Sequence, residues 1–149
     1  MLDITIDVND NDLRRLNKMP SDFRKGLLEG VRKGMMIAEA TSKKRMGKHG
    51  EIGVKSGHLR RSVHSKVQDE GDKIIGMLYS NVVYARIHEL GGTIRPRTKK
   101  YLRFKVNGKW VSKKEVTIPA RPYLRPSIEE NVERIKDVIV NSIIRKVED

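Results

Sequence analysis

Apolar and polar residues alternate at the start of the chain and again in its middle third. Leu2, Ile4, Ile6 and Val8 alternate with polar residues, which predicts a half-buried strand over residues 2–8. The same pattern predicts strands from Val63, over 73–80, over 101–106, and from Trp110 to 118 with an interruption at 113–115. The turn signals at 69–72 and at Asn107-Gly108 indicate antiparallel hairpins between them.

Apolar residues at three-to-four spacing predict two longer helices. The first runs from Asp22 to about Met46, with Ser21 as its N-cap. The second begins at Pro126 or Ser127 and runs to the chain end, with one apolar stripe formed by Ile128, Val132, Ile135, Ile139, Ile143 and Val147. Shorter helical segments are expected at 13–20, as one turn after Ser56, and at 82–90, where Gly91 and Gly92 signal the end.

Gly26, Gly30 and Gly34 form a stripe of small residues on the first long helix. Each costs about 1 kcal/mol relative to alanine in a helix interior. Such a cost suggests that another backbone approaches closely, either within the fold or from a neighbouring subunit. Simple tolerance by a well-packed helix is the alternative.

The order of these elements predicts one α+β domain over residues 1–149. A mainly antiparallel sheet, made of the amino-terminal strand and a central meander, is packed by the long helix and the carboxy-terminal helix, without the strand-helix alternation of a parallel sheet. The glycine-rich segment 47–57 and the basic turn 95–100 are expected to be mobile loops.

Three prolines stiffen the segment between the last strand and the last helix. Pro119, Pro122 and Pro126 each fix φ and push the preceding residue toward extended geometry. We therefore expect an extended connector from Ile118 to Arg125 that sets where the last helix leaves the sheet. We expect Arg121 to be held in place by these prolines and to pair with a carboxylate inside the fold or across a subunit boundary.

Basic residues are concentrated in the middle of the chain. The net charge of +13 divides into −1 for residues 1–20, +8 for 21–68, +8 for 69–126 and −2 for 127–149. Basic loops on one face would suit a polyanion such as nucleic acid, although a merely soluble surface has the same composition. Because the chain has seven aromatic residues and no recognised nucleic-acid motif, any such contact is electrostatic and independent of base sequence.

No segment carries a recognisable catalytic, cofactor or metal signature. The chain has no cysteine, and His88-Glu89 begins like a zinc-protease motif but lacks the second histidine four residues on. We therefore interpret His88 as structural or interfacial and expect no cofactor. The amino terminus lacks a signal-peptide pattern and no apolar run reaches membrane-spanning length, so we expect a soluble protein made in the cytoplasm without a membrane partner.

Four sequence blocks occur in an order that resembles a known group of proteins. They are Ser56-Gly57-His58-Leu59-Arg60-Arg61-Ser62, Tyr84 to Gly92, Tyr101 to Phe104, and Ile118 to Pro126. The order is similar to that of the Mu-like virion morphogenesis family and the related head-tail joining or tail-component proteins of tailed phages, over roughly residues 20–145. Tyr123 stands at the usual aromatic position of the last block.

The resemblance implies a non-enzymatic structural protein of the phage neck or tail end, present in the virion and made in the bacterial host. It would assemble as a ring, commonly of six subunits, with head-closure and tail-tube or terminator proteins as partners and DNA passing through the lumen. Identical wedges in a ring contact each other through two unlike patches. The acidic last helix meeting the basic middle of the next subunit is our own inference, and a basic DNA-associated accessory protein of a prophage or mobile element is the rival interpretation.

Two groups of residues follow as candidate sites. The candidates for a subunit interface or hinge are Tyr84, His88, Glu89, Gly91, Gly92, Pro119, Arg121, Pro122, Tyr123, Leu124 and Pro126. The candidates for a DNA-facing basic loop are Lys48, Lys55, Arg95, Arg97, Lys99 and Lys100.

Overall fold

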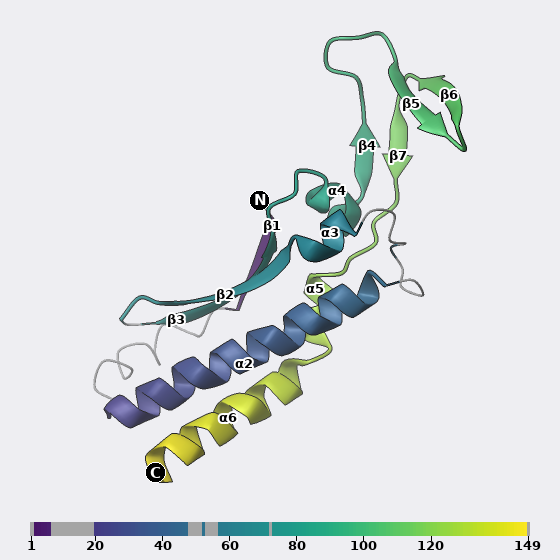
Figure 1. Ribbon diagram of the computed structural model, residues 1–149. Helices are drawn as coiled ribbons and strands as arrows, with labels where there is room; N and C mark the ends of the chain where they lie inside the picture. The colour runs from purple at the N-terminus through teal and green to yellow at the C-terminus, as the bar shows by residue number, and fades with distance from the viewer. Residues whose placement is uncertain (1, 7–19, 48–51, 53–56, 72, 149) are drawn as a thin grey trace.

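The computed structural model describes the backbone of residues 2–6 together with residues 20–47, 52, 57–71 and 73–148. In this part of the chain, three layers form the body of the molecule (Figure 1): a small sheet, the long helix α2 (Ser21–Arg45) against it, and helix α6 (Val132–Glu148) on the other side of α2. The predicted α+β class is confirmed. The carboxy-terminal helix packs on α2, however, and not on the sheet.

The sheet of the body has the strand order β1-β3-β2 and is antiparallel throughout. Its strands are β1 (Leu2–Ile6), β2 (Val63–Asp69) and β3 (Ile74–Ser80), as the alternating pattern predicts. Alternate residues of the central strand β3 are buried, with Leu78 fully covered. This face of the sheet therefore carries the core that α2 covers.

Helix α2 begins one residue earlier than its sequence indicates. The expectation that Ser21 is the N-cap is wrong, because Ser21 is already helical and Pro20 occupies the cap position with ψ 146° and no side-chain hydrogen bond. A proline before the first turn holds the entering chain extended. The short helix expected at 13–20 lies outside the described residues.

The glycine stripe of α2 is the contact with α6. A β-carbon added to Gly26 would lie 2.7 Å from the Cα of Ile143, and one added to Gly30 would lie 2.6 Å from the Cα of Ile139. At Gly34 the nearest atom would be the Cγ2 of Ile135, at 2.7 Å. The partner residues on α6 run from 143 down to 135 as the glycines of α2 run from 26 up to 34, so the two helices are antiparallel. The close approach that the stripe predicts is thus confirmed, and it lies within the fold.

The carboxy-terminal helix is two helices. Helix α5 (Arg125–Glu129) ends before Asn131, whose carbonyl accepts the first hydrogen bond of α6 from the Ile135 N–H at 2.8 Å. The Asn131 side-chain amide donates to the Ser127 carbonyl at 2.9 Å and to the Thr41 hydroxyl of α2 at 3.2 Å. These hydrogen bonds fix the chain at the interruption between α5 and α6, so the prediction of one uninterrupted helix is wrong.

Two further sheets replace the single meander that we expected. Strand β4 (Gly92–Ile94) pairs with β7 (Val116–Ile118), and β5 (Leu102–Val106) pairs with β6 (Lys109–Lys113). Asn107 and Gly108 both have positive φ, 50° and 78°, which confirms the predicted tight hairpin turn. Figure 1 shows residues 92–118 projecting from the body; we call this segment the arm.

Two short helices connect the body to its loops. Helix α3 (His58–Arg61) starts after Gly57, which has a φ of 69°, while Ser56, the expected cap, lies outside the described residues. Helix α4 (Ala85–Leu90) is shorter than expected, because residues 83–84 form a turn. Of the predicted mobile loop 47–57, Ile52 is buried in the core cluster; Lys48 and Lys55 lie outside the described residues.

Candidate functional site

Two of the sequence blocks, residues 84–92 and 118–126, meet at one junction between the body and the arm. Gly92 pairs with Ile118 in the ladder of β4 and β7, and the Arg121 N–H donates to the His88 carbonyl at 2.7 Å. Gly91 has a φ of 69°, and a β-carbon there would lie 2.7 Å from the Ala120 nitrogen. The junction therefore leaves no room for a side chain at this point.

Glu89 is the central group of the junction. Its carboxylate is buried, with the residue 4% exposed, and accepts backbone N–H bonds from Tyr123 at 2.7 Å, Leu124 at 2.9 Å and Arg125 at 3.0 Å. No Lys or Arg side chain forms an ion pair with it among the described residues. Backbone dipoles at the start of α5 thus hold this negative charge.

Tyr123 and Leu124, the hinge residues bound by Glu89, are both in the core. Tyr123 is 1% exposed and Leu124 is fully buried, where they join the cluster around Met35 and Leu78. Burial raises the pKa of the Tyr123 hydroxyl, and the negative charge of Glu89 raises it further. Residues 119–124 form neither strand nor helix. The expectation of an extended connector up to Arg125 is wrong at its end, because Leu124 has helical backbone angles, φ −83° and ψ −58°, and α5 begins at Arg125, one residue before the expected start, with Pro126 in its first turn.

Arg121 does not have the partner that we expected inside the fold. Its side chain is exposed, and no carboxylate lies within ion-pair distance of it among the described residues. The guanidinium of Arg121 lies near His88. Burial lowers the pKa of the His88 imidazole, and the positive charge of Arg121 lowers it further. The sequence pattern indicated Arg121 but not the contact that it makes, which is the hydrogen bond from its backbone N–H to the His88 carbonyl.

An exposed aromatic residue, Tyr84, lies beside two histidines at the edge of this junction. The Tyr84 hydroxyl is 2.8 Å from Nδ1 of His58, and its ring meets that of His88 edge-on at 6.1 Å between centroids. Tyr84 remains 42% exposed and its neighbour Val83 is 97% exposed. This cluster brings together the first and second sequence blocks at the molecular surface.

The arm is an open, cationic structure without a core of its own. None of its residues is buried, and it leaves apolar side chains such as Ile94, Tyr101, Val106 and Trp110 exposed. It carries nine exposed Lys and Arg residues against one carboxylate, Glu115, which binds Arg95 at 2.9 Å. Arg95, Arg97, Lys99 and Lys100, predicted as a basic loop, all lie here on its exposed turn.

Helix α6 has a second apolar row, which is exposed beside the stripe that packs on α2. Val140, Ile144 and Val147 are 52%, 46% and 60% exposed and lie at helical spacing. The single apolar stripe expected from the sequence is therefore divided: Ile135 is buried and Ile139 partly buried against α2, whereas Val132 and Val147 are exposed. We call Val140, Ile144 and Val147 the outer row.

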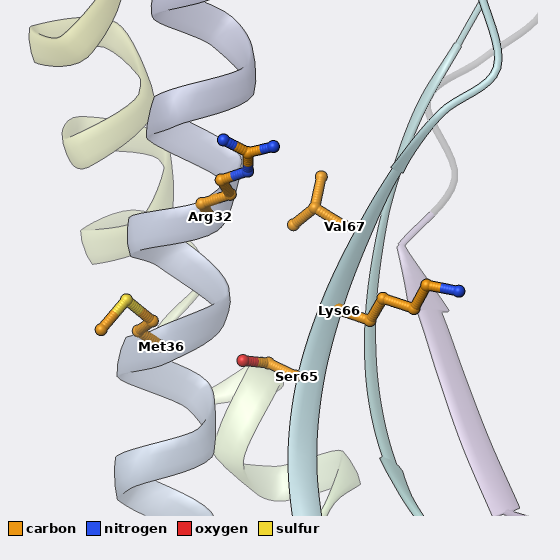
Figure 2. A pocket seen from close by; sticks show the side chains of 5 residues that line it. All are labelled: Arg32, Met36, Ser65, Lys66 and Val67. Carbon is orange, nitrogen blue, oxygen red and sulfur yellow. The ribbon is translucent and has the colours of Figure 1, made fainter.

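A shallow hollow lies between α2 and β2 (Figure 2). It is lined by Arg32 and Met36 from α2 and by Ser65, Lys66 and Val67 from β2. Figure 2 shows Ser65 and Val67 pointing toward α2, whereas Lys66 points away from it. Met36 is 65% exposed beside this hollow. The hollow lacks the convergent polar groups of a small-molecule site.

The described residues contain no arrangement that suggests a metal centre. No group of three His, Asp or Glu side chains in this part of the chain lies close enough to hold a metal ion. None of the helices in the described ranges is long and apolar enough to span a bilayer. The main features of the described residues are the junction, the cationic arm, the outer row of α6 and the hollow beside Met36.

Comparison with known proteins places the chain in a family. A sequence model of the phage virion morphogenesis family matches residues 35–143. Because this match covers well over half of its length, the chain belongs to the phage virion morphogenesis family. No curated protein and no solved structure matches it. The protein is thus a virion-associated morphogenesis protein of a bacteriophage, which confirms the coarser part of the expectation from the four sequence blocks.

Proposed function

We propose that this protein is a structural, non-catalytic subunit of a ring, commonly of six copies, at the head-tail junction or tail end of a tailed phage, where it completes head-tail joining. The observation that carries this proposal is that the folded chain leaves two unlike apolar surfaces uncovered. One is the outer row of α6, and the other is the Met36 edge of the hollow.

The two surfaces lie on different sides of the body. Gly30 and Gly34 of α2 face α6, whereas Met36, two positions after Gly34, lies about 200° around the helix from it. A subunit with two unlike patches makes head-to-tail contacts, and these close into a ring when the rotation permits. The neighbouring copy is therefore the occupant that we propose for both surfaces.

One pair of opposite charges fits the same pairing, although α6 as a whole has four basic and three acidic residues. The carboxylate of Asp137 lies one turn before the outer row, with no ion-pair partner among the described residues, and Arg32 lines the hollow. In the proposed contact, the outer row with Asp137 beside it would meet the Met36 edge with Arg32 beside it. The inference that the last helix meets the basic middle of the next subunit thus becomes a proposed contact between the outer row of α6 and the Met36 edge of the hollow in the next subunit.

The experiment is complementation in the phage or prophage that encodes the protein. A null mutant is expected to accumulate filled heads and finished tails that fail to join, visible by negative-stain electron microscopy. The Ile144→Asp variant is expected to fail in the same way while retaining the wild-type urea transition, because Ile144 is an exposed residue. Asn81→Asp, an exposed substitution outside the two proposed contact surfaces that also adds a negative charge, is the matched control and is expected to complement.

Two outcomes would overturn the proposal. A null mutant that is blocked before DNA-filled heads form would place the protein at another stage of morphogenesis. Full complementation by Ile144→Asp would show that the outer row is not a subunit contact.

A further inference from the structure

The positive charge of the molecule is concentrated on the arm. Residues 92–118 have nine Lys and Arg residues and one carboxylate, a net charge of +8 out of +13 for the whole chain. All nine cations are exposed, and among the described residues only Arg95 has a carboxylate partner. Like charges crowded in this way repel one another, so the free arm has an unfavourable electrostatic energy that a polyanion would relieve.

We propose that the arm binds the phosphate backbone of double-stranded DNA through these cations, without reading the base sequence. This binding is a property of the single chain and does not depend on the ring proposed above. Six of the nine cations are lysines, a residue type depleted in protein-protein interfaces. Lysine and arginine together are the usual partners of DNA phosphates.

One face of the β5–β6 ribbon presents its charges in a fixed arrangement. Trp110 pairs with Lys105 across the ladder, and its ring lies 5.1 Å from the Lys105 ammonium and 4.9 Å from the Arg103 guanidinium. Both cations are held over the exposed indole by cation-π attraction. Leu102, Phe104 and Val111 occupy the other face and are partly buried.

The shape of the arm suits a long, rigid ligand. A two-stranded antiparallel ribbon is narrow enough to enter the major groove of a duplex. Figure 1 shows the arm projecting away from α2 and α6. The arm's few aromatic residues offer little for base recognition, and the expected contacts are therefore with phosphates.

The test uses the full chain and a fluorescein-labelled duplex of 40 base pairs with random sequence, titrated by fluorescence anisotropy at several KCl concentrations. If about five arm cations contact phosphates, the logarithm of the association constant should fall with the logarithm of salt with a slope of about −4.5. Affinity should then fall about 500-fold between 50 and 200 mM KCl.

Two variants with the same loss of charge locate the binding surface. The arm variant combines Arg97→Gln, Lys99→Gln and Lys109→Gln, and the body variant combines Lys44→Gln, Lys66→Gln and Arg134→Gln. All six residues are exposed and make no ion pair among the described residues. The arm variant should bind more than about 10-fold more weakly at 100 mM KCl, with a slope shallower by about 2.7, whereas the body variant should bind within about twofold of wild type.

Several results would overturn this inference. Equal weakening by the two variants would show an effect of net charge alone. Tight binding with little salt dependence would exclude a phosphate-backbone mechanism. Binding to anionic lipid vesicles but not to the duplex would assign the arm to a membrane, and a changed oligomeric state of the arm variant with unchanged DNA affinity would assign it to a second copy of the chain.

Discussion

Replacing Glu89 is the sharpest test of how the fold holds its junction. The buried carboxylate accepts three backbone N–H bonds, and two of their donors, Tyr123 and Leu124, are in the core. In Glu89→Ala these two donors have no acceptor, and each buried donor without a partner costs about 1–3 kcal/mol. The free energy of unfolding should therefore fall by about 2–6 kcal/mol, a large part of the stability of a typical domain.

Glu89→Gln separates the hydrogen bonds from the volume of the side chain. Glutamine has nearly the same shape, but its amide offers one oxygen acceptor and places an NH₂ group against a backbone donor. Tyr123 and Leu124 donate to one carboxylate oxygen and Arg125 donates to the other, so an amide oxygen in the first place keeps both buried bonds and the NH₂ group faces the Arg125 N–H. We expect a loss of about 1–3 kcal/mol, because the part-buried Arg125 donor loses its acceptor. Glu129→Gln is the matched control: Glu129 is exposed, so the change should be within about 0.5 kcal/mol.

Urea unfolding followed by far-ultraviolet circular dichroism measures these differences. Tryptophan fluorescence is unsuitable, because Trp110 lies in the arm, outside the core. Hydrogen exchange by NMR adds a local measure, since the amide of Arg125 should lose protection in Glu89→Gln while those of Tyr123 and Leu124 keep theirs. The reasoning is refuted if Glu89→Gln has the same urea midpoint as wild type, or if the Arg125 amide stays as protected as in wild type.

Three further predictions concern the helix contact, the core and the junction. Gly30→Ala should destabilise the protein by about 1–3 kcal/mol in urea unfolding despite the better helix propensity of alanine, because the new methyl would meet the backbone of Ile139 at 2.6 Å; an unchanged midpoint would show that α6 moves away freely. Leu124→Ala should cost about 2–5 kcal/mol in the same assay, since Leu124 is fully buried; a loss below about 1 kcal/mol would contradict its place in the core. Arg121→Gln should raise the pKa of His88 toward its ordinary value in an NMR titration, because one of its two lowering causes is removed while burial remains; an unchanged pKa would show that burial alone sets it.

Sequence periodicity predicted what depends on local contacts. The alternating pattern located β2 and β3, the three-to-four spacing located α2, and Asn107-Gly108 located the hairpin turn. These features depend on residues within a few positions of one another. The glycine stripe also predicted a close backbone neighbour, although not which one.

The candidate site was predicted in part. Residues 84–92 and 118–126 were both candidates from the sequence blocks, but the blocks did not show that these two segments bind each other, or that Glu89 and not Arg121 makes the central contact. A glutamate shortly before two glycines indicates such a contact only when the groups that donate hydrogen bonds to its carboxylate are known. Those donors lie more than thirty positions away and belong to the backbone, which has no sequence signature.

By itself, the sequence determined the α+β class, the long glycine-striped helix, the hairpins and the basic middle of the chain. Only the tertiary structure decided that the glycines face α6, that the predicted meander divides into three sheets, and that the last helix breaks at Asn131. It also decided that +8 of net charge lies on a projecting arm. The reason is physical: periodicity records which face of an element is apolar, whereas the partner of that face depends on contacts between segments distant in the chain.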